Sequence, residues 1–148
     1  MAQTTDGISS REFKIESSTD GSAWTDRSGF ACKITPSGGE RDSGKKHTFD
    51  GDPPILVRGK IDAKMLAVEF VYTEGGSDFW TAAYTAYMNN TAFYLRWHPK
   101  GGQTGEYKFT TTAGIVKNCA EPAGDADSAD VVLGRFDLEV ASITQAAN

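Results

Sequence analysis

The sequence predicts a mainly β fold of α+β character, a β-sandwich or partly closed barrel with one flanking α-helix. Two observations support this prediction. Short segments of alternating apolar and polar residues recur along the 148 residues, and turns rich in Gly, Asp and Ser separate them. One segment, residues 79–88, instead repeats its apolar side chains at helical spacing. The length is typical of one domain, so we expect residues 1–148 to form a single unit.

The first half of the chain contains four predicted strands. Residues 12–16 alternate polar and apolar side chains, and residues 29–35 form a second candidate that Pro36 is expected to end. Residues 55–61 and 65–74 are rich in β-branched and aromatic residues. Because residues 65–74 are apolar on one face and partly apolar on the other, we expect a helix or another chain to cover them.

A long polar stretch, residues 36–54, separates two of these strands. Phe49 is its only large apolar residue. Irregular loops of this length are uncommon inside a compact domain, and they tend to be functional or disordered. We therefore expect a long polar loop here, with a solvated surface loop as the alternative to a functional one.

The helix is predicted from its caps as well as from its periodicity. Ser77 or Asp78 is a suitable N-cap, and Asn89 and Asn90 are suitable stop residues. The large side chains on one stripe are Trp80, Tyr84, Tyr87 and Met88. We expect this stripe to pack on the sheet.

The second half predicts a hairpin and two more strands. Residues 93–98 and 106–110 flank a glycine-rich turn, and residues 114–119 follow as another strand. An acidic loop with four carboxylates covers residues 121–130. The last strand runs from residue 131 to about 143, and its alternation slips near Ala141, which indicates a bulge or a strand end. The whole chain predicts seven to nine strands.

Charge and hydropathy exclude several functions. The 20 Asp and Glu outnumber the 15 Lys and Arg, which gives a net charge of −5 with no basic patch, so a sequence-reading DNA-binding protein is excluded. No apolar run approaches the roughly 18 residues of a membrane span, and residues 1–7 lack a signal peptide's basic and apolar regions. We expect a protein that is made and kept in a cytoplasm and contacts no membrane.

No pattern of residues predicts catalysis or metal binding. Cys32 and Cys119 belong to no ligand cluster, and we expect two reduced, packed thiols, with a disulfide as the less favoured alternative. The two histidines, His47 and His98, have no partner at ligand spacing and are expected to be solvated. No nucleophile, phosphate-binding or zinc motif is present, so we predict no catalytic, cofactor or metal site and no enzymatic activity.

A weak cation site in the acidic loop is the alternative to this absence of metal binding. The three aspartates that favour it are Asp125, Asp127 and Asp130. They lack the glycine and the bidentate glutamate that a calcium-binding helix–loop–helix requires, so a solvated loop is the preferred interpretation.

Several turns and strand ends give a more specific signal. They are residues 22–30 (SAWTDRSGF), 37–41 (SGGER), 48–52 (TFDGD), 71–75 (VYTEG), 94–97 (YLRW) with 99–102 (PKGG), and 109–111 (FTT). Together they resemble the tail tube (major tail) proteins of long-tailed bacteriophages, over residues 12–144. The resemblance implies a β-sandwich or barrel subunit, six copies of which close into a ring whose inner strands form one continuous β-barrel.

The resemblance also implies a function and partners. Rings stack into a hollow tube through which DNA leaves the capsid without sequence-specific binding. The protein would be a structural component of the virion tail, assembled in the bacterial host cytoplasm, and would meet other tail proteins such as the tape measure, the baseplate or tip, and the terminator. The type VI secretion tube protein is a structural cousin in this family.

Two sets of residues are candidate sites under this resemblance. The long loop would reach a neighbouring subunit or ring through its charged residues, Arg41, Asp42, Lys45, Lys46, Asp50 and Asp52. The polar faces of the strands at residues 65–74 and 131–143 would line an acidic lumen, with Glu69, Asp137 and Glu139 as candidates. The outer surface of the tube is an equally weighted alternative for these three carboxylates.

A carbohydrate- or protein-binding β-sandwich module is the alternative function. It would use Trp24, Trp80 and Trp97 as stacking platforms. Trp80 lies on the helical stripe and Trp97 on a strand, so we expect these two indoles to belong to the core.

Overall fold

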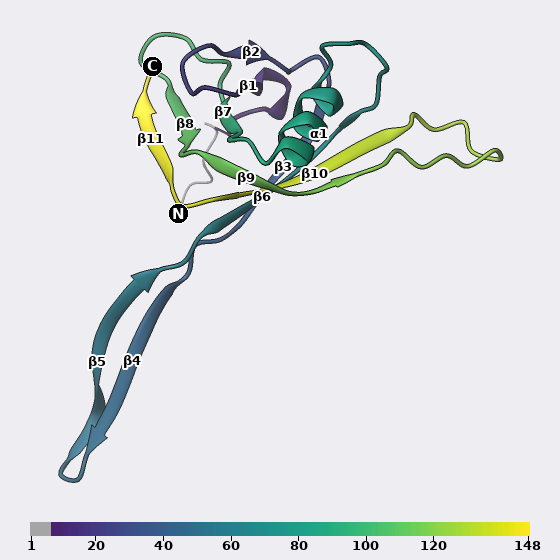
Figure 1. Ribbon diagram of the computed structural model, residues 1–148. Helices are drawn as coiled ribbons and strands as arrows, with labels where there is room; N and C mark the ends of the chain where they lie inside the picture. The colour runs from purple at the N-terminus through teal and green to yellow at the C-terminus, as the bar shows by residue number, and fades with distance from the viewer. Residues whose placement is uncertain (1–6) are drawn as a thin grey trace.

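The computed structural model describes residues 7–148, in which two β-sheets, one α-helix and a protruding two-stranded arm are found (Figure 1). Sheet A has the strand order β11-β8-β7-β1-β2. Its strands are β1 (Lys14–Ser18), β2 (Thr25–Asp26), β7 (Tyr94–His98), β8 (Tyr107–Thr111) and β11 (Ile143–Ala147). A short 3-10 helix, η1 (Ser10–Glu12), precedes β1.

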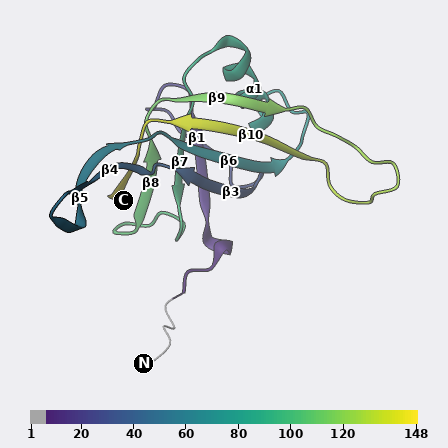
Figure 2. The same ribbon diagram turned by 90° about the horizontal axis from the view of Figure 1, so that it is seen from below.

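Sheet B has the strand order β3-β6-β10-β9, and all its pairings are antiparallel (Figure 2). Its strands are β3 (Ala31–Gly38), β6 (Lys64–Val71), β9 (Gly114–Ala120) and β10 (Leu133–Val140). The arm consists of β4 (Arg41–Thr48) and β5 (Gly51–Ile61), which pair with each other. The described residues thus hold eleven strands, more than the seven to nine predicted, because β2, β4 and β11 are short or polar strands that the pattern did not reveal.

The core lies between one face of sheet B, sheet A and the helix. Along β6 and β10 buried residues alternate with partly exposed ones, as predicted for Leu66, Val68 and Phe70. Phe136 on β10 packs against Phe70 and Phe79 with ring centroids 6.0 and 5.2 Å apart. Burying aromatic side chains of this size is the largest contribution that single residues make to folding.

The helix α1 (Phe79–Asn89) begins and ends where its caps predict. The Asp78 carboxylate accepts a hydrogen bond from the Thr81 backbone N–H, and Asn90 ends the helix in the left-handed conformation. The prediction that the aromatic stripe packs on the sheet holds for half of it: Trp80 and Tyr84 are half-buried against the core, whereas Tyr87 and Met88 are exposed. The fully buried residues of the helix are Phe79, Ala83 and Ala86, and the helix packs against β9 and β10.

The break in the apolar–polar alternation near Ala141 corresponds to a strand end, where the chain turns from one sheet of the sandwich to the other. The chain leaves sheet B after Val140 and enters sheet A at Ile143. At this corner the Thr112 backbone N–H donates to the Ser142 carbonyl, 3.1 Å away, which joins it to the β8–β9 corner.

The prediction of a long irregular loop over residues 36–54 was wrong. Most of this stretch forms the arm, which extends away from the body as a β-hairpin (Figure 1). Pro36 does not end a strand but lies inside β3. Proline is tolerated there because β3 is an edge strand, where a backbone nitrogen without a hydrogen can face away from the sheet. The one α-helix of the described chain is too short to cross a membrane.

Candidate assembly surfaces

The arm exposes nearly all of its side chains. Every residue of β4 and most residues of β5 are exposed. All six charged residues predicted to contact a neighbouring subunit lie on it or beside its tip: Arg41, Asp42, Lys45, Lys46, Asp50 and Asp52. Few of them are engaged within the arm, since Arg41 donates to the Gly59 carbonyl at 3.0 Å and Asp52 lies 3.2 Å from the His47 imidazole.

The arm also carries apolar side chains that the sequence analysis did not single out. Ile55, Leu56, Val57 and Ile61 on β5 are each more than half exposed, and the exposed fraction of Phe49 at the tip is 110%. A signal for this exposure existed in the sequence. Residues 55–57 are consecutively apolar, and the partner strand Arg41–Thr48 has no apolar side chain with which to bury them. An apolar surface of this kind on an isolated hairpin marks an interaction site.

Sheet B has an open face opposite the core, and the predicted lumen residues lie together on it. Directly paired residues share a face, and three such rows cross the sheet. They are Lys33, Glu69 and Arg135; Thr35, Ala67, Asp137 and Asn118; and Ser37, Met65, Glu139 and Ile115. The structure therefore brings Glu69, Asp137 and Glu139 onto one surface, although they come from two strands distant in sequence.

Carboxylates and cations alternate on this open face. Asp137 pairs with Arg135 at 3.2 Å, and Glu139 pairs with Lys117 at 3.3 Å. Glu69 lies in register between Lys33 and Arg135. The pairing shifts between Asp137 and Leu138, which places both Lys117 and Asn118 on the exposed side of β9. The face is thus charge-balanced, not acidic as predicted for these strands.

Both edges of sheet B are largely open within residues 7–148. β3 and β9 are the outermost strands, and the outer side of β9 is paired only at Gly114, which forms an isolated bridge with Phe93. β3 has eight residues, most of them exposed, and β9 has seven. Unpaired edges of this length offer free backbone N–H and C=O groups to a further strand, which makes them templates for association.

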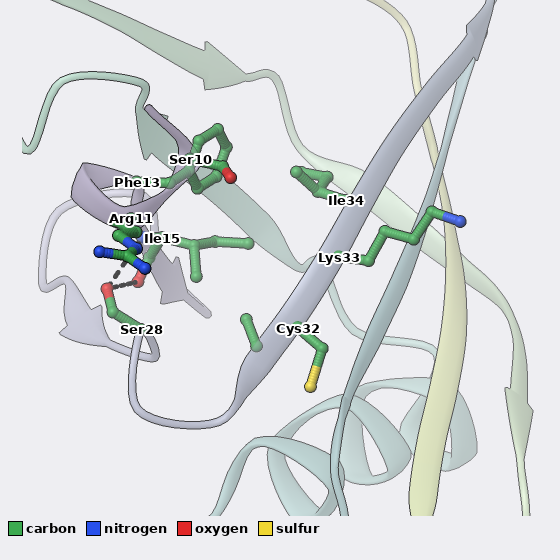
Figure 3. Close-up of a pocket in the computed structure, with 9 residues that line it drawn as sticks. Ser10, Arg11, Phe13, Ile15, Ser28, Cys32, Lys33 and Ile34 are labelled. Carbon is green, nitrogen blue, oxygen red and sulfur yellow. Dashed lines mark hydrogen bonds between the residues drawn. The ribbon is translucent and has the colours of Figure 1, made fainter. Parts of the chain in front are cut away.

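A cleft of about 470 Å³ opens beside the β3 edge (Figure 3). Its walls come from η1 and the start of β1 on one side and from β3 on the other. Its apolar lining consists of Phe13, Ile15, Ala31 and Ile34. The two charged residues that line it, Arg11 on η1 and Lys33 on β3, are both cationic.

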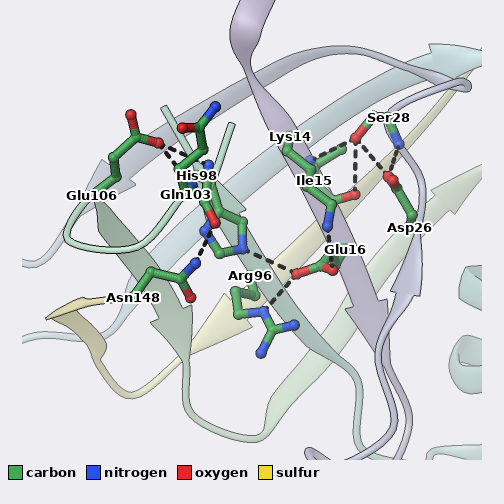
Figure 4. Close-up of polar contacts among 11 residues, drawn as sticks. Lys14, Ile15, Glu16, Asp26, Ser28, Arg96, His98, Gln103, Glu106 and Asn148 are labelled. Atoms are coloured by element: carbon green, nitrogen blue, oxygen red, sulfur yellow. Dashed lines mark hydrogen bonds and ion pairs between the residues drawn. The ribbon is translucent and has the colours of Figure 1, made fainter. Parts of the chain in front are cut away.

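A buried ion cluster centred on Glu16 joins β1 to β7 (Figure 4). The Glu16 carboxylate lies 2.6 Å from Arg96 Nε, 3.1 Å from His98 Nε2 and 3.0 Å from Lys14 Nζ. Burial alone would raise the pKa of Glu16, but hydrogen bonds from Arg96, Lys14 and His98 outweigh it and lower the pKa to about 2. The prediction that His98 is solvated was wrong, because this imidazole is buried under Gly102.

The three tryptophans are engaged within the chain. Trp97 is buried and stacks on Phe109 with centroids 5.6 Å apart. Trp80 stacks on Tyr84 and donates from Nε1 to the Ala120 carbonyl at 3.2 Å. The Arg96 guanidinium lies 4.3 Å from the centroid of the Trp24 ring. These contacts leave no set of open indole faces for stacking on sugars.

The remaining candidate groups do not form a reactive site. Both cysteines are free, and Cys119 is buried as predicted. The prediction that Cys32 is packed was wrong, because this residue lies on the edge strand β3 and is exposed. Burial raises the pKa of the Cys119 thiol to about 11, which keeps it protonated. Within residues 7–148 no three His, Cys, Asp or Glu side chains are arranged to hold a metal ion.

Comparison with models of known protein families finds no match, and comparison with curated proteins finds none either. Solved structures do match. The chain is similar to a chain of the SPP1 tail tube, with a TM-score of 0.68 and 15% identity over 96% of this chain and 80% of that one. It is similar to a chain of the sheath-tube complex of an extracellular contractile injection system, with a TM-score of 0.67 and 12% identity over 97% and 94%.

A third match extends the comparison to another kind of particle. A chain from the tail of an empty gene transfer agent particle superimposes with a TM-score of 0.63 and 10% identity over 99% of both chains. All three likenesses cover almost the entire chain. They show that this protein has the tail-tube fold, the mainly β architecture with one α-helix that its sequence predicted.

Proposed function

We propose that this protein is a tail tube subunit: a structural, non-enzymatic protein that assembles into six-membered rings, which stack into a hollow tube for the passage of DNA. One observation is central. The described subunit leaves three surfaces open: the β3 edge of sheet B, the β9 edge beyond the bridge at Gly114, and an arm with exposed Ile55, Leu56 and Val57. Such surfaces are aggregation hazards in a monomer and are removed when the sheet closes on copies of itself.

The free edges indicate how a ring closes. If β3 of one copy pairs with β9 of the next, the four strands of sheet B continue into the neighbouring sheet, and six copies form one barrel. The core face of sheet B is covered by sheet A and α1. Only the open face is left to line the bore, so Glu69, Asp137 and Glu139 become lumen residues.

The charge balance of the open face suits passage of a polyanion. DNA is held when Lys and Arg displace counterions from its phosphates. Here the cations Arg135 and Lys117 already have carboxylate partners on the same face, 3.2 and 3.3 Å away. DNA would therefore meet a bore that offers no free cationic patch and would move without being retained.

The arm provides the contact between subunits or rings. Its charged residues and its exposed apolar residues leave the body at one end of sheet B, where Gly38 and Lys64 are paired (Figure 1). The similar solved structures belong to a tail tube, a sheath-tube complex and a gene transfer agent tail. We expect the same kind of surroundings: a virion tail, assembled in a bacterial cytoplasm, with tape measure, baseplate or tip, and terminator proteins as partners.

The experiment that tests this function is negative-stain electron microscopy of the purified protein over a concentration series, with light scattering on the same samples. We expect rings or hollow tubes above a threshold concentration. A particle that stays monomeric at every concentration contradicts the proposal and favours the binding-module alternative.

A further inference from the structure

The tip of the arm presents one aromatic side chain followed by two acidic residues. Phe49 stands at the turn between β4 and β5 with an exposed fraction of 110%, and Asp50 and Asp52 follow it. Both carboxylates are on the exposed tip, and Asp52 has only the exposed His47 imidazole near it. A phenylalanine fully in water gains free energy when a second surface covers it.

The cleft beside β3 has the complementary properties. Its lining is apolar, from the half-buried Phe13 and Ile34 and the buried Ile15. Arg11 on η1 is the cation at its rim, whereas the Lys33 side chain points to the other side of β3, toward the open face of sheet B (Figure 3). A volume of about 470 Å³ leaves ample room for one benzyl side chain.

We infer that Phe49 at the tip of one subunit's arm inserts into the cleft between η1 and β3 of a second copy of this chain. Asp50 and Asp52 then face Arg11 at the rim of the cleft. Apolar burial supplies the affinity of this contact, and the opposite charges select the orientation. The inference rests on the proposed function, since it names the surface that receives the arm.

The topology of sheet B places the two surfaces at opposite ends of the subunit. The arm leaves the sheet where Gly38 pairs with Lys64, whereas Ala31 and Ile34 of the cleft lie toward the other end of β3. A contact between two different surfaces at opposite ends is heterologous, so each copy receives one arm and extends another. Such a contact propagates along an axis, as the stacking of rings requires.

The arm is long enough for this contact. The 11 residues of β5 span about 36 Å at strand geometry, and the eight residues of β3 span about 26 Å. The tip therefore reaches well beyond the end of its own sheet B. This reach brings it to the near end of a subunit stacked on the first.

Cys32 makes the contact directly testable, because this exposed native thiol lines the cleft. In Thr48→Cys, which keeps Phe49 and places a thiol beside it on the exposed tip, a short bismaleimide should join the tip of one copy to Cys32 of the next. The expected product is a ladder of covalent multimers on a denaturing gel. Cys119 does not compete, since its thiol is buried.

Two controls separate this contact from random collisions. Thr48→Cys with Cys32→Ser removes the receiving thiol and should abolish the ladder, apart from any tip-to-tip dimer. Ser43→Cys places a thiol on exposed β4, away from the tip, and should give no ladder. Rings or tubes that form without a Cys32-dependent ladder overturn this inference while leaving the proposed function intact. A protein that never assembles overturns both.

Substitutions that create no thiol give an independent measurement. Phe49→Ala should raise the concentration needed for assembly about tenfold or more, since it removes a large buried apolar side chain, whereas Phe49→Leu should largely preserve assembly. Reversing the charges of Asp50 and Asp52 to Lys should weaken assembly, and the added change Arg11→Glu should restore it in part. Equal assembly by Phe49→Ala and wild type overturns the inference.

Discussion

The Glu16 carboxylate on β1 accepts a 2.6 Å hydrogen bond from Arg96 Nε on β7, across 80 residues of sequence. Glu16 is 6% exposed, and the His98 imidazole and the Lys14 ammonium complete its surroundings. The same guanidinium covers the Trp24 ring. Arg96 thus connects the buried acid to the segment that leads into β2, and the cluster joins the two central strands of sheet A.

Removing the carboxylate should destabilise the fold strongly. We expect Glu16→Ala to lower the free energy of unfolding by about 3–5 kcal/mol, because it leaves the Arg96 and His98 side chains without their charged partner. Urea unfolding below the assembly concentration measures this loss. Lys14→Ala is the matched control: its side chain is 36% exposed, and the expected cost is below about 1 kcal/mol. Equal losses in the two variants would contradict a central role for Glu16.

Stability should fall in acid as Glu16 becomes protonated. Its pKa is about 2 in the folded protein against an ordinary value of 4.5, so the folded state binds fewer protons than the unfolded state in this range. The stabilisation is complete above about pH 5 and is lost as the pH falls through 4.5 toward 2.

Asp78 also has a lowered pKa, since its hydrogen bonds with Thr81 and Thr73 and the charge of Arg27 outweigh its burial. A difference measurement therefore isolates Glu16. The pH dependence of the unfolding free energy should be shallower in Glu16→Gln than in wild type between pH 5 and 2. If the curves of the two proteins were parallel, the pKa of Glu16 would be the same in the folded and unfolded states, and the prediction would be wrong.

Two features of position 102 should require glycine: a positive φ, and the close approach of the His98 imidazole. Its φ is +86°, and a Cβ there would lie 2.8 Å from Nδ1 of the buried His98. Gly105 has a similar φ of +87° with open space around it. Gly105→Ala should cost about 1–2 kcal/mol, the price of the left-handed conformation alone. Gly102→Ala should cost at least about 1 kcal/mol more, through the added crowding. Thermal unfolding of both variants checks this order, and equal costs would contradict it.

The arm should be needed for assembly and not for folding. Replacing residues 41–61 by a short glycine-rich turn joins Glu40 to Asp62, whose backbone groups already pair at 2.9 Å. Because the arm residues are exposed, we expect a folded subunit with a near-wild-type melting temperature that forms no tubes. Circular dichroism and electron microscopy check the two outcomes. Tubes of normal length from this variant would contradict a role for the arm in assembly.

The open face of sheet B should retain DNA once its carboxylates are neutralised. Glu69→Gln, Asp137→Asn and Glu139→Gln together leave Lys33, Arg135 and Lys117 without acidic neighbours on that face. If the face lines a bore, assembled tubes of this variant should hold short duplex DNA protected from nuclease, with an affinity that falls steeply with salt.

The matched control for the open face changes the same amount of charge elsewhere. Asp125, Asp127 and Asp130 lie in the exposed β9–β10 loop, and their replacement by Asn should not protect DNA. Nuclease digestion followed by gel electrophoresis distinguishes the two variants. Digestion of DNA bound by the open-face variant would place that face on the outside of the tube.

Features governed by neighbours in sequence were predictable. The alternation of Leu66, Val68 and Phe70 determined which face of β6 is buried. Asp78 and Asn90 determined the ends of α1, and the slip at Ala141 located the corner between the two sheets. The resemblance to tail tube proteins, carried by turns and strand ends, predicted the fold that the structural matches show.

The exposure of side chains depended on partners that are distant in sequence. Residues 41–48 have no apolar alternation, and they form a strand only because residues 51–61 pair with them. His98 is buried because Glu16 and Gly102 come to it from β1 and from the turn after β7.

The sequence by itself therefore determined the strands of alternating pattern, the helix and its caps, and the absence of a catalytic motif. The tertiary structure decided that the polar stretch is an arm, that Tyr87 and Met88 of the helix stay exposed, and that three carboxylates share one face with three cations. The carboxylates are Glu69, Asp137 and Glu139. The physical reason is the distance along the sequence over which each kind of interaction acts. Periodicity and capping act over a few residues, whereas burial, register and charge pairing depend on which segments the completed fold brings together.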